Sequence, residues 1–173
     1  NRNYSQVQNL SSRNYIDITF LPELKFQTTY SYDFWLYSYH GYTTPDYGSM
    51  KGRGQVYKQR DMGTTWTLSN ILTYNKTFGD NTINALLGQE AYNSKYNYLN
   101  ATREDLPFGG LYELNAAATM TGSGSYENNY RLLSFLSRFE YDYKSKYSLS
   151  ASLRSDGSSR FSPESRWGTF WSA

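Results

Sequence analysis

Residues 147–154 alternate strictly between two kinds of side chain, and this pattern constrains the fold more than any other feature of the chain. The odd positions carry Tyr147, Leu149, Ala151 and Leu153, and the even positions carry Ser148, Ser150, Ser152 and Arg154. A period of two places the two sets on opposite faces of a β-strand. One face is then apolar and the other carries hydroxyls and a charge, as expected of a wall that separates hydrocarbon from water.

The composition narrows the class of protein further. Hydrophobic residues make up only 38% of the chain, and 19 of the 173 residues are Tyr, which concentrates where one end of the ring is dry and the other wet. No apolar run approaches the roughly 20 residues that a membrane helix needs, so an α-helical membrane protein is excluded while a β-barrel is not. The absence of Cys excludes a disulfide framework and a thiolate metal site, and the formal charge of +2 is too small to indicate a nucleic-acid partner.

The same alternation predicts six strands and the start of a seventh. The predicted strands cover residues 14–20, 24–36, 64–77, 82–96, 128–143 and 147–155, with another beginning near 169. The connections alternate between short turns and long loops over residues 37–63, 97–127 and 156–168, and they contain all four prolines. Alternating loop lengths are typical of an outer-membrane barrel, which has short periplasmic turns and long extracellular loops. Aromatic residues near the short turns predict a periplasmic aromatic girdle, formed by Phe20, Phe26, Tyr74, Phe78, Tyr141, Tyr143 and Tyr147.

Three runs of the sequence resemble the SusC/RagA-type TonB-dependent outer-membrane transporters of Bacteroidetes. The run 143–172 resembles the family's short YKxKY turn, its strand ending in SLRxDGSSRF and its RWGxFPS segment, with Trp171 where the family usually has Pro. The runs 18–34 and 72–91 resemble two further hairpins of that family. The family-motif residues to which we assign a structural role are Asp156, Gly157, Ser158, Ser159, Arg160, Phe161, Arg166, Trp167 and Gly168.

The resemblance implies an all-β fold, an antiparallel transmembrane β-barrel segment that supplies six to seven strands of a barrel of about 22. Residues 1–173 would be part of the barrel domain, and the plug domain and the remaining strands would lie outside this sequence. The family implies the outer membrane of a Gram-negative bacterium and TonB-driven import of a glycan oligosaccharide or peptide. Its partners would be a SusD-like surface lipoprotein, TonB, outer-membrane lipid and the remainder of the barrel. We expect no enzymatic activity and no cofactor.

Two groups of residues that could suggest catalysis have simpler interpretations. The run from Asp156 to Arg160 could offer a Ser nucleophile or an anion site, but no His or Lys is suitably placed, and we expect a structural loop in which Arg160 or Arg166 pairs with local carboxylates. Arg138, Glu140 and Asp142 share one face of a predicted strand. A carboxylate pair occurs in glycosidases, yet adjacent charges on one strand face are more simply the wet lining of a barrel lumen.

Aromatic residues near the outer ends of two predicted strands are the candidate substrate-binding residues. Aromatic rings can stack on sugar rings while neighbouring polar groups hydrogen-bond hydroxyls. The same residues could instead form an outer aromatic girdle and pack the loops together. The alternative function for the whole chain is a non-transporting surface β-protein, such as an adhesin or a carbohydrate-binding module. The candidates are Trp35, Tyr37, Tyr39, Tyr42, Tyr47, Tyr96 and Tyr98.

Overall fold

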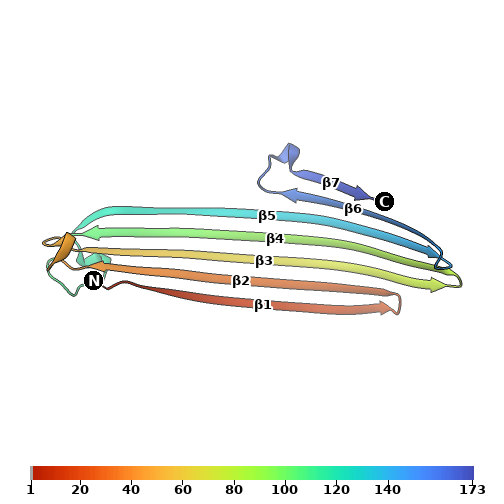
Figure 1. Ribbon diagram of the computed structural model, residues 1–173, viewed down its shortest axis with the longest axis horizontal. Coiled ribbons are helices and arrows are strands. Elements are labelled where there is room, and N and C mark those ends of the chain that lie inside the picture. The colour runs from red at the N-terminus through yellow and green to blue at the C-terminus, as the bar shows by residue number, and fades with distance from the viewer. Residues whose placement is uncertain (1) are drawn as a thin grey trace. The chain divides into compact units, whose positions relative to one another are not determined.

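The computed structural model describes residues 2–173 as a single β-sheet. Seven strands are hydrogen-bonded in chain order from β1 to β7, as Figure 1 shows, and the predicted all-β antiparallel fold is confirmed. No helix among residues 2–173 is long and apolar enough to cross a membrane. The strands are β1 (Tyr4–Leu21), β2 (Leu24–Thr43), β3 (Gln55–Phe78), β4 (Asn81–Glu104), β5 (Thr119–Tyr143), β6 (Tyr147–Ser158) and β7 (Trp167–Ser172), with 3-10 turns η1 (Gly48–Met50), η2 (Leu114–Ala116) and η3 (Pro163–Ser165) in the connections.

The strands are longer than the sequence predicted. The predicted loops 37–63 and 97–127 shrink to residues 44–54 and 105–118, because β2, β3, β4 and β5 continue well into them. The bounds of these two loops were therefore wrong. The added stretches carry polar residues on both faces, as in Lys58, Gln59, Arg60 and Asp61 of β3, so they show no apolar alternation from which a strand could be recognised.

The short turns fall where they were predicted. Residues 22–23, 79–80 and 144–146 join β1 to β2, β3 to β4 and β5 to β6, and all four prolines lie outside the strands. Gly79 has a φ of 57°, and Lys144 and Ser145 have φ of 52° and 51°. Positive φ at turn residues matches the twist of the strands that a tight hairpin joins, which explains why Gly stands at position 79.

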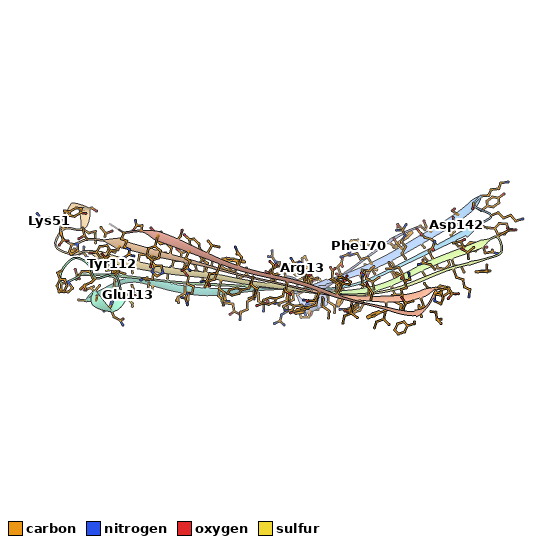
Figure 2. All side chains as sticks on the ribbon, turned by 90° about the horizontal axis from the view of Figure 1, so that it is seen from below. Arg13, Lys51, Tyr112, Glu113, Asp142 and Phe170 are labelled. Atoms are coloured by element: carbon orange, nitrogen blue, oxygen red, sulfur yellow. The ribbon has the colours of Figure 1, made fainter. Side chains whose placement is uncertain are left out.

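The chain divides into two compact units that share strands. We call the first the loop unit, because it contains the connections 44–54 and 105–118, and the second the turn unit, because it contains the three short turns. The loop unit comprises the residues up to Leu10 with 33–64 and 95–129, and the turn unit comprises 11–32, 65–94 and 130–173. Figure 2 shows the side chains on both sides of the strands.

The turn unit has one apolar face and one polar face. Across the β5–β6 hairpin, Phe139 lies opposite Ala151 and Tyr141 opposite Leu149, so their side chains share a face. On β7, Trp171 lies opposite Leu153, which extends the same face. This apolar face is uncovered, since the side chains that define it are all at least 40% exposed: Phe135, Phe139, Tyr147, Leu149, Leu153, Trp167 and Trp171. The predicted assignment of faces in β5 and β6 is confirmed.

The polar face of the turn unit carries self-paired charges. Arg138 forms an ion pair with Glu140, and Arg154 Nε donates to Asp156 with 2.8 Å between Nε and Oδ2. Paired charges and hydroxyls of this kind suit a face in contact with water.

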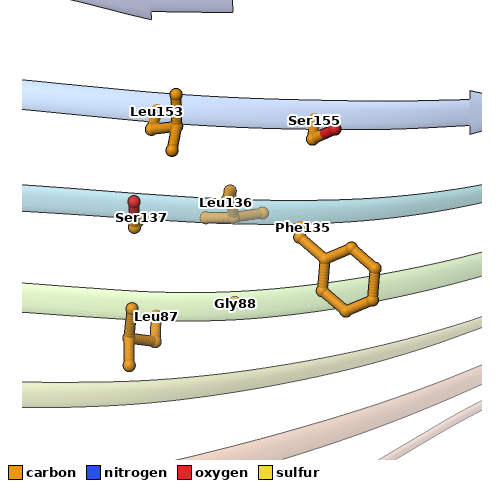
Figure 3. A pocket seen from close by; sticks show the side chains of 7 residues that line it. All are labelled: Leu87, Gly88, Phe135, Leu136, Ser137, Leu153 and Ser155. Carbon is orange, nitrogen blue, oxygen red and sulfur yellow. The ribbon is translucent and has the colours of Figure 1, made fainter. Parts of the chain in front are cut away.

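The turn unit contains a shallow pocket in which a glycine of β4 lies against a leucine of β5. Its lining comes from β4, β5 and β6, and Figure 3 shows the side chains. Gly88 has no side chain because Leu136 occupies the space, and a Cβ at position 88 would lie 2.7 Å from Leu136 Cγ. Here glycine is required by packing between strands.

The loop unit contains the only cluster of fully buried apolar residues in the described part of the chain. Tyr42 of β2, Val56 of β3 and, from the connection 105–118, Leu106 and Ala117 form this core, which holds that connection against the strand ends. Glu104, only 9% exposed, pairs with Arg53 and accepts a hydrogen bond of 3.0 Å from Gln55 Nε2. Because the Glu104 carboxylate is buried and holds two donors, although Arg53 itself is exposed, it fixes the start of the second connection more firmly than a fully exposed ion pair would.

Candidate functional site

Six aromatic side chains gather on one face of the loop unit, and we call this surface the tyrosine face. The Trp35 ring centroid lies 5.9 Å from that of Tyr96, and the Tyr126 centroid lies 5.6 Å from Tyr96 and 5.2 Å from Tyr98. The Tyr39 and Tyr57 centroids are 5.8 Å apart. Four strands contribute, because alternate residues of neighbouring strands meet on one face. The members are Trp35 and Tyr39 of β2, Tyr57 of β3, Tyr96 and Tyr98 of β4, and Tyr126 of β5.

A chain of hydrogen bonds runs between the rings of the tyrosine face. The Tyr57 hydroxyl donates to Gln59 Oε1 at 2.7 Å, and Gln59 Nε2 donates to Asp61 Oδ2 at 2.7 Å. The other oxygen of Asp61 accepts from the Tyr96 hydroxyl at 3.1 Å. Asp61 is 8% exposed, so this buried carboxylate is satisfied by neutral donors and holds both hydroxyls in fixed orientations.

Two tyrosines of this face, Tyr57 and Tyr96, stay neutral at physiological pH. Burial, followed by hydrogen bonding and charge interaction with Tyr98, raises the pKa of Tyr57 to about 12. Burial also raises the pKa of Tyr96, together with its hydrogen bonds to Tyr126 and Asp61. The face therefore offers ring surfaces and neutral hydroxyl and amide groups, which suit a ligand rich in hydroxyls or amides.

The structure separates the predicted candidates into three groups. Trp35, Tyr39, Tyr96 and Tyr98 lie together on the tyrosine face, and Tyr37 lies in β2 at an alternate position between Trp35 and Tyr39, half-buried.

The other two candidates lie elsewhere. Tyr42 belongs to the core of the loop unit, where it is 6% exposed and its hydroxyl accepts a hydrogen bond from the Gly110 N–H at 2.8 Å. Tyr47 is 63% exposed in the connection 44–54. The ring contacts between neighbouring strands are also what the girdle and packing interpretation would require.

Sequence reasoning missed Tyr57, Asp61 and Tyr126. All three lie in stretches that were predicted as loops or at a loop end, so no strand alternation was assigned to them. The sequence offered no usable signal there, because residues 55–61 are largely polar on both faces even though Tyr57, Gln59 and Asp61 are alternate residues.

The family-motif residues 156–168 cover the end of β6, the connection 159–166 and the start of β7, so the bounds of the predicted loop 156–168 were wrong. Asp156 accepts from Arg154, and the Gly157 position is covered by Trp167, whose Cε2 would lie 2.9 Å from a Cβ there. The Trp167 ring also stacks on Phe135, with 6.1 Å between centroids. The Trp167 indole thus fills the space that a side chain would occupy at Gly157.

The rest of this connection is held mainly by backbone hydrogen bonds. Ser158 N donates to Arg166 O at 3.1 Å, Ser159 N donates to Arg131 O at 2.9 Å, and Phe161 N donates to Ser158 O at 3.4 Å. The Arg160 guanidinium lies over the Tyr130 ring at 4.6 Å, and Gly168 lies opposite Asp156 in the strand register. Within residues 2–173, Arg154 pairs with Asp156, so the expected pairing through Arg160 or Arg166 was wrong.

The opposite face of the loop unit carries charged residues around the single histidine. Lys58 Nζ lies 2.7 Å from His40 Nδ1 and 3.2 Å from Glu113 Oε1. The Tyr4 ring stacks on the imidazole, with 4.5 Å between centroids. Burial and the neighbouring Lys58 lower the pKa of His40 below its ordinary value of 6.5, while Glu113 opposes the shift.

We expect the pKa of His40 to respond in opposite directions to two neutral substitutions. Lys58→Gln removes a cation and should raise the pKa toward 6.5, whereas Glu113→Gln removes the stabilising anion and should lower it further. The folded protein binds this proton less readily than the unfolded chain. The contribution of His40 to stability is therefore complete above pH 6.5 and is lost as the pH falls from 6.5 through the lower pKa of the folded state. The measurement is an NMR titration of the imidazole resonances, and shifts of the same sign in both variants would contradict it.

Among the described residues, no three His, Asp or Glu side chains gather closely enough to hold a metal ion.

Comparisons with known proteins identify the class of protein. No family model matches the chain. It is 32% identical over 165 residues to TonB-dependent receptor P39 of Formosa agariphila, covering 91% of this chain and 16% of the relative. It is 29% identical over 97 residues to TonB-dependent receptor SusC of Bacteroides thetaiotaomicron, covering 56% of this chain and 9% of SusC. The chain thus spans less than a fifth of the length of these relatives.

The fold agrees with these relatives. A structure of the RagAB peptide transporter matches 98% of this chain and 20% of its own chain, with a TM-score of 0.91 at 20% sequence identity. A second structure, of the RagAB peptide importer in its closed-closed state, gives a TM-score of 0.90 over 98% of this chain and 19% of the other. The likeness shows a shared sheet, which in this chain does not close on itself. From its sequence relatives and its fold together, the chain belongs to the SusC/RagA-type TonB-dependent receptors.

Proposed function

We propose that this chain forms part of the barrel wall of an outer-membrane importer that is driven by TonB. Its sheet has two edge strands, β1 and β7, which need partners because unpaired strand edges are not tolerated in lipid. Residues 1–173 would therefore belong to a barrel domain whose remaining strands and plug domain come from sequence outside this range. The plug would carry the contact with TonB.

The two faces of the turn unit support a place in the membrane. The apolar face is uncovered, and it consists of uncharged side chains such as Phe135, Phe139, Leu149, Leu153 and Trp171. We therefore assign it to outer-membrane lipid. The polar face, with its paired Arg138 and Glu140, is assigned to the lumen.

The loop unit is assigned to water outside the cell. It carries charged groups on both faces: Lys58 and Lys95 lie on one, and Asp61 and Glu104 lie on the other. A stretch of sheet that is charged on both sides would be costly in hydrocarbon.

The tyrosine face is the observation that supports substrate binding. Its rings and neutral hydroxyl and amide groups fit a glycan oligosaccharide or a peptide, both of which present hydroxyl or amide groups beside apolar patches. We infer that Trp35, Tyr37, Tyr39, Tyr96 and Tyr98 contact the substrate. A SusD-like surface lipoprotein would cover the outer opening.

Uptake of labelled oligosaccharides and peptides by cells that depend on this receptor tests the proposal. The double variant W35A/Y98A should reduce uptake by about tenfold or more, because each lost stacking contact contributes roughly 0.5–1.5 kcal/mol and the rings also exclude water. Leu99→Ala is the matched control, since Leu99 follows Tyr98 on the other face of β4 and is 56% exposed. Equal uptake by both variants, at equal amounts of receptor in the outer membrane, would overturn the assignment.

A further inference from the structure

The charged face of the loop unit contains a small pocket that the transport proposal does not use. The pocket has a volume of about 150 Å³ and is lined by Arg2, Tyr4, His40, Lys58, Tyr112 and Glu113. A second pocket of about 350 Å³ adjoins it, shares His40, Lys58 and Glu113, and adds Arg60. All of these residues belong to one unit, so the site is defined by that unit alone.

Hydrogen-bond donors outnumber acceptors among the charged groups of this site. The Lys58 ammonium has three N–H donors, of which one faces His40 Nδ1 at 2.7 Å and one faces Glu113 Oε1 at 3.2 Å. Because His40 accepts at Nδ1, its own proton must lie on Nε2, which is then a further donor. Glu113 is the only carboxylate in the lining, and it is already paired.

Two guanidinium groups increase the excess of donors. The Arg2 guanidinium carbon lies 5.7 Å from the Tyr4 ring centroid and 5.0 Å from that of Tyr112, so the two rings place this cation at the pocket. Arg60 is exposed and forms no ion pair in the described part of the chain. The two adjoining pockets together thus contain three cationic side chains and one anionic side chain, with Arg2 in the smaller pocket, Arg60 in the larger one, and Lys58 and Glu113 in both.

We propose that the site formed by these two adjoining pockets, which share His40, Lys58 and Glu113, binds a phosphate group, either as free phosphate or as the headgroup of an anionic lipid. Lys58 and Arg60 are alternate residues of β3 and so project from the same face, while Arg2 approaches from the start of the chain. Donors that converge from several directions match the tetrahedral oxygens of phosphate better than the planar oxygens of a carboxylate, and charge-assisted bonds of this kind are strong. This site offers an excess of cationic groups to an anion, whereas the tyrosine face carries the Asp61 carboxylate, so the two sites are chemically distinct.

Calorimetric titration of inorganic phosphate into the full-length receptor in a neutral detergent tests the site directly. The double variant K58Q/R60Q should weaken binding by about tenfold or more, because it removes two charge-assisted donors. The matched control is K51Q/K95Q, which removes the same charge from exposed positions of the same unit; Lys95 pairs with Glu127 outside the pocket, with 2.9 Å between Nζ and Oε2. The control should bind phosphate as the parent does.

A second arm distinguishes the two sources of phosphate. The receptor is released from nanodiscs of mixed phosphatidylglycerol and phosphatidylcholine, and the retained lipid is identified by native mass spectrometry. Selective retention of phosphatidylglycerol that K58Q/R60Q abolishes and inorganic phosphate displaces assigns the site to a lipid headgroup. Phosphate binding without lipid retention assigns it to free phosphate. If neither probe binds, or if both double variants lose binding equally, the proposal is wrong.

Discussion

Replacing Leu153 by arginine is expected to block assembly of the receptor in the outer membrane. Leu153 lies near the middle of β6, is 49% exposed, and stands opposite Ser137 on β5 and Trp171 on β7, on the apolar face. An arginine on the lipid face of a barrel costs about 2–4 kcal/mol at the bilayer midplane. Because folded proteins are stable by only about 5–15 kcal/mol, a loss of this size should markedly lower the amount of folded receptor.

The matched substitution on the other face is Ser150→Arg, in the same strand. Ser150 lies opposite Glu140, so the new guanidinium would face a carboxylate and water. Arg154, in the same strand, already pairs with Asp156 on this face. The measurement is the amount of heat-modifiable, folded receptor in outer-membrane fractions. Equal loss in both variants would refute the assignment of faces, and normal amounts of the Leu153→Arg protein would refute the contact with lipid.

The strands of the turn unit were predicted better than those of the loop unit, because each has one apolar and one polar face. From Tyr147 to Arg154 every apolar residue alternates with a hydroxyl or a charge, which predicts both the strand and its two faces. The short turn then sets the register between β5 and β6. From Gln55 to Asp61 both faces are largely polar, and the same strand geometry leaves no apolar signal.

The candidate site was predicted only in part for a related reason. The clustering of aromatic residues near the outer ends of two predicted strands identified Trp35, Tyr39, Tyr96 and Tyr98 as candidates. Whether these rings lie beside Tyr57 and Tyr126 depends on the register in which β2, β3, β4 and β5 pair. The long connections between these strands do not reveal that register in the sequence. Tyr42 shows the converse limit: it is another tyrosine of the same strand as Tyr39, but it belongs to the core that β2 and β3 form with the connection 105–118.

Gly63→Ala is expected to weaken substrate binding without removing any residue that contacts the substrate. Gly63 is buried in β3 beneath the Trp35 indole, and a Cβ there would overlap the ring, with Cζ2 only 2.8 Å away. The indole must therefore move, since forcing one more carbon into a filled space costs about 1–3 kcal/mol. Displacing Trp35 also separates it from Tyr96 and disrupts one side of the tyrosine face.

The expected result is a two- to about tenfold rise in the substrate Kd, because one aromatic contact contributes roughly 0.5–1.5 kcal/mol. Gly122→Ala is the matched control: a Cβ at position 122 would lie 3.5 Å from Thr102 Oγ1, an ordinary contact, so the same chemical change should leave binding intact. A difference in tryptophan emission between Gly63→Ala and the parent reports the movement of the ring. Emission that changes while the Kd does not would show that Trp35 packs the strands together rather than binding substrate, and would favour the girdle interpretation of the tyrosine face.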